Sequence, residues 1–168
     1  MSTSTSQTSP PRRLPAVAKA LMRFQAFLLR RNWMGALGDE IMVITVTGRK
    51  SGQRYSTPIG FLRDAAVKTA AGEDTVLALT GGAGGASNWY RNVLHHPEVV
   101  LEIKGQARRA RGEPIQAEAE RRRILALYQR ERRANFHRLF GLAADAPAEA
   151  MEHALATRVF IRFYPLAD

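Results

Sequence analysis

The sequence predicts an α+β, mainly β domain in which antiparallel strands form a small barrel or sheet with packed helices. Several short runs rich in valine, isoleucine and aromatic residues have turn signals at their ends, which is typical of strands. Most of these runs are joined as hairpins and interrupted by helices, so a repeating βαβ parallel sheet is excluded. The 168 residues, 45% of them apolar, are enough for one domain with its own core.

The first part of the chain is predicted to be a tail followed by a basic amphipathic helix. Residues 1–13 are polar and contain prolines, which predicts a disordered tail and no signal peptide. Over residues 15–31 apolar side chains recur at helical spacing, with cations on the other faces. The helix either packs on the domain or contacts an anionic membrane surface. We expect a single domain over residues 14–168 that includes this helix.

A β-hairpin with a cationic turn is predicted next. Residues 41–47 (IMVITVT) form an apolar strand, residues 48–53 (GRKSGQ) a turn and residues 54–63 the returning strand. Pro58 lies inside the second strand. Because proline has no N–H to donate, this strand is expected at an edge, a bulge or an opening of the sheet.

The elements after this hairpin follow from turn signals and periodicity. In chain order we expect a loop (residues 64–74), a strand (75–80), a glycine-rich connection (81–86) and a helix capped by Ser87 (87–96). A hairpin of two strands around Gly105 (98–104 and 106–113), two helices (118–133 and 147–156) and a last strand (157–165) follow.

Composition limits the chemistry of the protein. The formal net charge is +10, and residues 1–63 hold ten cations against two acids. The absence of cysteine excludes disulfides and thiol catalysis, and the four histidines lack carboxylates at metal-ligand spacing, so no metal site is predicted. The arginines of residues 121–133 belong to a helix with interspersed glutamates and lack stacking aromatics, so nucleic-acid binding is not predicted. We expect a cytoplasmic protein, since no segment indicates secretion or a membrane span.

The cationic turn is one candidate for a binding site. Gly48 and Gly52 permit backbone conformations that point several N–H groups at one place. Arg49 and Lys50 add positive charge, and Ser51 adds a hydroxyl donor. The spacing leaves two interpretations open, a solvated basic hairpin tip and a site for an anionic group.

A second candidate is the segment TGGAGGASNWY, residues 80–90. Its glycines stand between a strand and a helix, the N-terminus of the helix provides positive potential, and Trp89 offers a large ring. It lacks the βαβ context of the dinucleotide fingerprint. The segment is either a flexible loop before a core tryptophan or one wall of a ligand site, and two glycine-bearing turns together favour one shared site.

The segments ITVTGRKSGQRYSTPIGFLRD and NWYRNVLHHPEVVLEI resemble the deazaflavin-dependent nitroreductase family of flavin and deazaflavin oxidoreductases, over about residues 24–165. The resemblance implies a split β-barrel of the FMN-binding type. It also implies the cofactor 8-hydroxy-5-deazaflavin, coenzyme F-420, whose tail carries phosphate and polyglutamate. The implied reaction is hydride transfer from the reduced coenzyme to a quinone-like, nitro or other conjugated acceptor.

The resemblance also implies the site. Its implied cofactor-binding residues are Arg49, Lys50, Ser51, Gln53, Pro58, Gly81, Gly82, Ala83, Trp89 and Asn92. Tyr128 is the candidate proton donor, or else a core tyrosine on its helix. The chain departs from the family at Arg54 and Tyr55, where members commonly have proline and arginine, and at Glu131, where nitroimidazole-reducing members have a second tyrosine.

Two other functions remain open on the sequence alone. One is a split-barrel protein that binds FMN, and the other is a non-enzymatic lipid- or membrane-binding module. The expected partner is a small-molecule acceptor, and the protein is expected to be a monomer or a homodimer. Peripheral contact of the basic helix with the inner face of the cell membrane is a second hypothesis.

Overall fold

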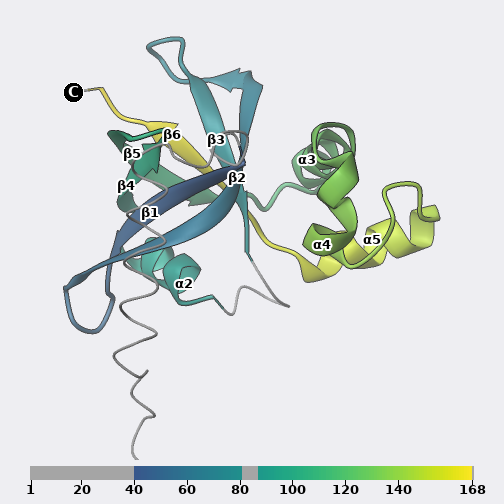
Figure 1. The fold of residues 1–168 in the computed structure, drawn as a ribbon, viewed down its shortest axis with the longest axis horizontal. Helices are drawn as coiled ribbons and strands as arrows, with labels where there is room; N and C mark the ends of the chain where they lie inside the picture. The colour runs from purple at the N-terminus through teal and green to yellow at the C-terminus, as the bar shows by residue number, and fades with distance from the viewer. Residues whose placement is uncertain (1–39, 81–86, 168) are drawn as a thin grey trace, which may run out of the picture.

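The centre of the computed structural model, which describes residues 40–80 and 87–167, is a closed barrel of six antiparallel strands (Figure 1). The strand order around the barrel is β1-β2-β3-β6-β5-β4. The strands are β1 (Ile41–Thr47), β2 (Arg54–Lys68), β3 (Asp74–Leu79), β4 (Glu98–Ile103), β5 (Gln106–Pro114) and β6 (Phe160–Pro165). The predicted antiparallel barrel is therefore confirmed. The predicted tail and the helix of residues 15–31 lie outside the described residues.

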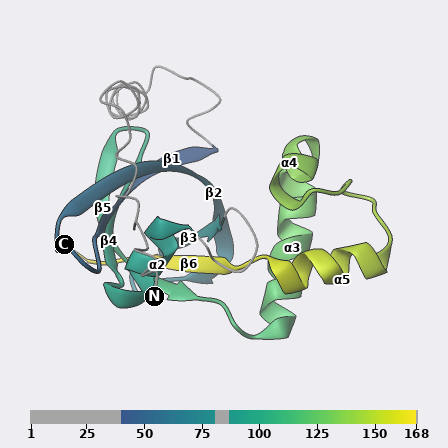
Figure 2. The ribbon, with the colours of Figure 1, turned by 90° about the horizontal axis from the view of Figure 1, so that it is seen from below.

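The helices occupy two separate places around the barrel. Helix α2 (Asn88–His95) lies across one end of the barrel, and the other helices form a group beside it (Figures 1 and 2). This group contains α3 (Glu118–Glu131), the 3-10 turn η3 (Arg133–Asn135), α4 (Phe136–Phe140) and α5 (Ala148–Thr157). The short η3 and α4 were not predicted, since their few residues show no helical period.

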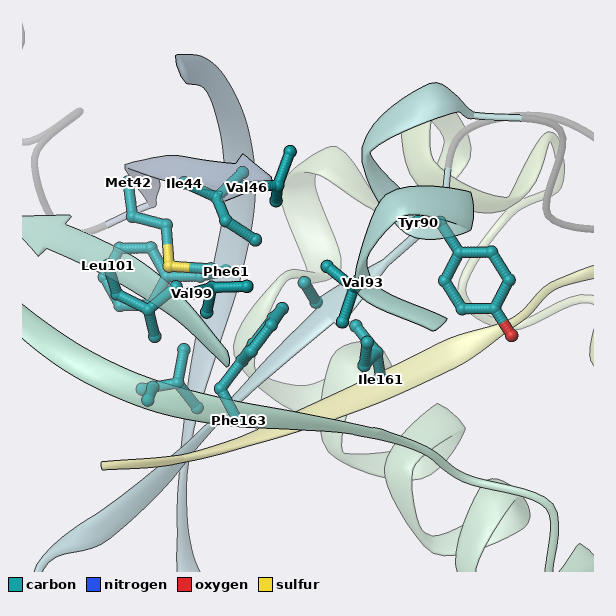
Figure 3. Packing of buried hydrophobic residues seen from close by; sticks show 13 residues of the cluster. Met42, Ile44, Val46, Phe61, Tyr90, Val93, Val99, Leu101, Ile161 and Phe163 are labelled. Carbon is teal, nitrogen blue, oxygen red and sulfur yellow. The ribbon is translucent and has the colours of Figure 1, made fainter. Parts of the chain in front are cut away.

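Alternate residues of the strands fill the barrel interior (Figure 3). The buried cluster consists of Met42, Ile44, Val46, Phe61, Val76, Ala78, Tyr90, Val93, Val99, Leu101, Ala110, Ile161 and Phe163. Val93 comes from α2 and closes one end of this core. It packs so near β5 that a Cβ atom on Gly112 would lie 2.7 Å from the Val93 side chain, so glycine is required there. Helix α2 is thus held firmly on the barrel.

A second core joins the outer face of the barrel to the helical group. Leu62 and Leu77 point away from the interior, as expected for neighbours of Phe61 and Val76 in strands of period two. They pack with Phe160 and with apolar residues of the helices: Ile124, Leu125, Tyr128, Phe136, Phe140, Met151, Ala154 and Leu155. Strands β2, β3 and β6 consequently contribute apolar side chains to both cores.

Strand β2 is longer than predicted. It continues through residues 64–68, which were predicted to begin a loop, and pairs with β3 across an irregularity between Asp64 and Lys68. The sequence DAAVK has weak strand character, so the extension depends on tertiary contacts of Asp64, which is 1% exposed. The predicted loop over residues 64–68 was therefore wrong.

Pro58 lies at an edge, as predicted. Residues 54–60 of β2 pair with β1, and Pro58 stands opposite Val43. Pairing of β2 with β3 begins only at Phe61, so the other edge of residues 54–60 has no strand partner within the described part of the chain. A residue without an N–H is tolerated there because no ladder bond is lost.

A cluster of four charges joins the barrel to helix α3, and two of its members, Asp64 and Arg162, are buried. Asp64 of β2 accepts hydrogen bonds from Arg162 of β6 at 2.6 Å and from Arg123 of α3. Glu120 of α3 accepts bonds from the same two guanidinium groups, at 2.6 Å from Arg162 and 2.7 Å from Arg123. Each charge of the cluster therefore has two partners of opposite sign, which the buried Asp64 and Arg162 require.

The cluster shifts the titration of both carboxyl groups. Burial by itself raises the pKa of Asp64, but the hydrogen bonds from Arg123 and Arg162 outweigh this effect and hold the pKa below its ordinary value. The hydrogen bond from Arg123, with a second from Arg162, lowers the pKa of Glu120 to about 2. Both groups are ionised at neutral pH and contribute to the attachment of α3.

Replacement of Asp64 should strongly destabilise the fold. Asp64→Asn leaves the buried Arg162 with one carboxylate partner in place of two, and we expect a loss of about 3 kcal/mol in the free energy of unfolding. Urea denaturation at neutral pH measures this loss. The control is Arg109→Gln, which removes an exposed pair with Glu98 and should cost less than about 1 kcal/mol. Equal losses in the two variants would contradict a structural role for the cluster.

Acid should weaken the same attachment. Because the folded-state pKa of Glu120 lies below the ordinary value of 4.5, its contribution to stability is complete above that pH and is lost as the pH falls toward about 2. Glu120→Gln should be less stable than the wild type at pH 7. The difference in the free energy of unfolding should become smaller as the pH falls from 4.5 toward about 2. Urea denaturation across the range is the measurement, and Glu149→Gln in α5 is the control. A difference in the free energy of unfolding that does not change with pH would contradict the lowered pKa of Glu120.

Candidate functional site

The cationic turn between β1 and β2 is closed by backbone hydrogen bonds. The Gly48 N–H donates to the Gln53 carbonyl at 2.7 Å, and the Gly52 N–H donates to the Gly48 carbonyl at 2.8 Å. Gly52 has a φ of +67°, in the left-handed region that favours glycine. The predicted turn over residues 48–53 is confirmed. Its two backbone hydrogen bonds fix the conformation of the turn and so the direction of its side chains.

A pocket of about 430 Å³ lies between this turn and α2. Its described lining is Gly48, Arg49, Lys50, Ser51, Tyr55, Asn88 and Asn92. The lining contains two cations, two hydroxyl groups and two side-chain amides, and none of these described residues is acidic. A pocket of this kind suits an anionic group with many oxygen atoms, such as a phosphate.

Arg49 is held in this pocket by α2. The Asn92 Oδ1 atom accepts from the Arg49 backbone N–H at 3.2 Å and from Arg49 Nη1 at 2.9 Å. Asn92 is only 7% exposed, and its neighbour Val93 is anchored in the barrel interior. The amide therefore orients the guanidinium group, which keeps N–H donors in addition to the one that Asn92 accepts.

Tyr55 forms another wall of the pocket. Its hydroxyl and the Ser51 Oγ atom are hydrogen-bonded at 3.0 Å, and the Gln53 backbone N–H donates to the same Oγ at 3.3 Å. The ring lies so close to the turn that a Cβ atom on Gly48 would be 2.6 Å from Tyr55 Cε2 and 2.7 Å from Ser51 Oγ. A side chain at the first glycine of the turn would displace Tyr55 and Ser51 from these positions.

The other predicted cofactor residues lie apart from this pocket or outside the description. The exposed Gln53 bonds the turn through its backbone, and Pro58 lies farther along β2. Trp89 is partly buried, packs against the barrel core and meets the Tyr90 ring edge to face. Gly81, Gly82 and Ala83 lie outside the described residues. The cofactor roles of these six residues stay predictions.

A second cavity, of about 330 Å³, lies between the barrel and helices α3 and α4. Its described lining is Glu40, Ile41, Gly60, Phe61, Leu79, Tyr128, Arg132, Asn135, Arg138 and Leu139. Gly60 follows Tyr55 on β2 by five residues, which corresponds to about 17 Å of strand. The same strand therefore contributes to the cationic pocket and, farther along, to this largely apolar cavity.

Tyr128 belongs both to this cavity and to the second core. It is 3% exposed, and its ring contacts Phe140 and Phe160 at centroid distances of 5.7 and 6.2 Å. Burial raises the pKa of the Tyr128 hydroxyl, so the group keeps its proton at neutral pH. The hydroxyl oxygen has no hydrogen-bond partner among residues 40–80 and 87–167. Its role as a proton donor stays a prediction.

Sequence reasoning missed several lining residues. Asn88 and Asn92 are four residues apart on one helix, so they share a face, and this spacing could have identified Asn88 with Asn92. Tyr55 was treated as a departure from the family pattern, whereas the structure places it on the pocket side of β2. Asn135 and Arg138 come from η3 and α4, which the sequence did not reveal.

Comparison with known families decides the assignment. The family model of the F420H(2)-dependent quinone reductases matches residues 16–138, most of the chain. The chain belongs to this family. It is therefore a reductase that uses the deazaflavin coenzyme F-420, in agreement with the sequence-based prediction of cofactor and enzyme class. The acid-free pocket around Arg49 and Lys50 fits the phosphate-bearing tail of such a coenzyme.

Several solved structures resemble this quinone reductase in fold. The protein Atu2129 of Agrobacterium tumefaciens, of unknown function, has 13% identity and a TM-score of 0.52 over 95% of this chain and 60% of that chain. A pyridoxamine 5'-phosphate oxidase-related, FMN binding protein of Nostoc punctiforme has 13% identity and a TM-score of 0.46, over 90% of this chain and 81% of that chain. An F420-H2 dependent reductase has 18% identity and a TM-score of 0.43, over 73% of this chain and 93% of that chain. The closed antiparallel barrel of this chain has the fold class that the sequence predicts.

Two further expectations concern metals and membranes. Among residues 40–80 and 87–167, no group of histidine and acidic residues is arranged to hold a metal ion. Within the same ranges no helix has the length and apolar character that a membrane span requires. Membrane contact through residues 15–31 and the oligomeric state stay predictions.

Loss of Asn92 should weaken coenzyme binding through Arg49. Asn92→Ala removes the acceptor of both Arg49 bonds, and hydrogen bonds to charged groups contribute about 1.5–3 kcal/mol, so affinity for oxidised F-420 should fall about tenfold or more. Fluorescence titration measures the affinity. Arg91→Gln, on the same helix but outside the pocket, is the control and should bind nearly as the wild type does. A larger effect of the control would indicate long-range charge as the cause.

Proposed function

We propose that the protein transfers a hydride from reduced coenzyme F-420 to a quinone-like acceptor, with the coenzyme tail in the pocket around Arg49 and the acceptor in the cavity beside Tyr128. The observation that carries this proposal is the arrangement along β2. A cationic, acid-free pocket and a largely apolar cavity lie about 17 Å apart on one strand. The anionic tail of the coenzyme and a flat conjugated acceptor need such a pair of environments.

The residues of the turn would bind the tail. Arg49 and Lys50 provide charge for the phosphate, and the Ser51 hydroxyl and the turn provide donors. Asn92 positions Arg49, and Tyr55 positions Ser51. The hydride would come from the bound reduced deazaflavin, which would be oxidised by two electrons. The protein contributes orientation, because a fixed geometry removes the entropy cost of bringing two reactants together.

The second cavity would receive the acceptor. Ile41, Leu79 and Leu139 provide apolar surface for a flat conjugated ring and exclude water. The Tyr128 hydroxyl keeps its proton and lacks a partner among the described residues, so it can donate a hydrogen bond or a proton to an acceptor oxygen. The edge of residues 54–60, which no described strand covers on that side, leaves room for a ligand between the two environments.

Removal of both cations from the turn tests this function. The double variant Arg49→Ala, Lys50→Ala should lose about 100-fold or more in affinity for oxidised F-420, because two charge-assisted contacts are removed. Its thermal stability should change little, since Lys50 is exposed and the turn is closed by backbone bonds. Fluorescence titration with F-420 and with FMN, followed by turnover of reduced F-420 with menadione, provides the measurements.

The outcomes of these experiments are distinct. Unchanged F-420 affinity in the double variant would remove the turn from the site. Tight binding of FMN in place of F-420 would support a flavin-binding protein, and the absence of turnover with any quinone, nitro or conjugated acceptor would overturn the proposed reaction. The control Lys104→Ala removes a cation from the tip of the β4–β5 hairpin, outside the pocket around Arg49.

A further inference from the structure

The second cavity carries a cation that the mechanism above does not use. Arg138 of α4 lines this cavity and is exposed. It has no hydrogen bond or ion pair with another residue of the described part of the chain, in contrast to Arg122, Arg123 and Arg162, which are all paired. An arginine that borders an apolar cavity with its donors unused is suited to an anionic ligand group.

The remaining charges of the described lining do not cancel this cation. Arg132 is a second guanidinium, and its Nη2 atom donates to the Phe61 carbonyl at 3.1 Å. Glu40 is the one acid in the described lining, and it accepts a hydrogen bond from Asn135 Nδ2 at 3.2 Å. Two guanidinium groups against one carboxylate leave the described lining with a net positive charge.

We infer that the acceptor carries an acidic substituent, such as a carboxylate or sulfonate on a quinone ring, which binds Arg138 while the ring occupies the apolar part of the cavity. This inference rests on the proposed function, since it specifies the class of acceptor for the same site. A guanidinium group offers paired N–H donors that match the oxygens of a carboxylate or sulfonate. Arg138 is a specificity residue in this assignment, and it does not touch the reacting atoms.

The acidic substituent takes no part in the reaction. The quinone gains a hydride and a proton, its two carbonyl groups become hydroxyl groups, and the reduced coenzyme is oxidised by two electrons. The substituent stays ionised and bound throughout. Its contact therefore forms in the ground state as well as in the transition state, and we expect it to influence KM more than kcat.

The test compares an anionic acceptor with a neutral one of similar shape. We would measure kcat and KM for 1,4-naphthoquinone-2-sulfonate and for menadione with the wild type, Arg138→Glu and Arg133→Glu. Arg138→Glu should lower the ratio of kcat/KM, anionic over neutral acceptor, about tenfold, mainly through KM. Arg133→Glu makes the same charge change in η3, outside the described lining of the cavity, and should leave the ratio unchanged.

Salt and binding measurements complete the test. The preference for the anionic acceptor should shrink at about 0.5 M salt, because exposed charges are screened. Binding of the sulfonate to the protein with oxidised F-420, measured without turnover, should weaken in Arg138→Glu only. Equal ratios in all three proteins, or equal losses in both variants, overturn the inference and leave the proposed function intact if menadione is reduced. Absence of menadione turnover overturns the proposed function, and the binding measurement then still decides the role of Arg138.

Discussion

The buried carboxylate of Asp64 is the constraint on which the arrangement of this protein depends. A carboxylate without water is costly unless several donors surround it, and here Arg162 of β6 and Arg123 of α3 provide them. Glu120 then balances the second charge of the pair of arginines. The cluster fastens the helical group to the barrel at one point on β2 and β6, beside the apolar contacts of the second core.

Strand β2 connects all the functional features in a single element. It begins after the cationic turn, places Tyr55 beside that turn, runs along an edge at Pro58 and reaches the second cavity at Gly60. It then ends beyond Asp64, where the helices are attached. A rigid strand of this length fixes the spacing between an anion pocket and an apolar cavity, which flexible loops would not do.

The two environments differ in chemical character. The pocket around Arg49 has cations and neutral donors, whereas the cavity beside Tyr128 is mostly apolar with polar groups at its margin. The family uses a deazaflavin coenzyme for hydride transfer, so the difficult chemistry belongs to the coenzyme. The protein contributes positions, and two helices set them: α2 holds Arg49 through Asn92, and α4 presents Arg138.

The sequence by itself determined the barrel class, the turn over residues 48–53 and the order of most elements, because these depend on local patterns of apolar residues, glycines and prolines. Pro58 predicted an edge for the same reason, since a missing N–H is a local property. The tertiary structure alone decided the length of β2, the place of Tyr55 and the partner of Arg49. Each of these depends on residues distant in sequence: Asp64 is stabilised by Arg162, and Arg49 is held by Asn92. Local patterns cannot specify which buried charges or amides meet, because that choice follows from the closure of the barrel and the packing of helices upon it.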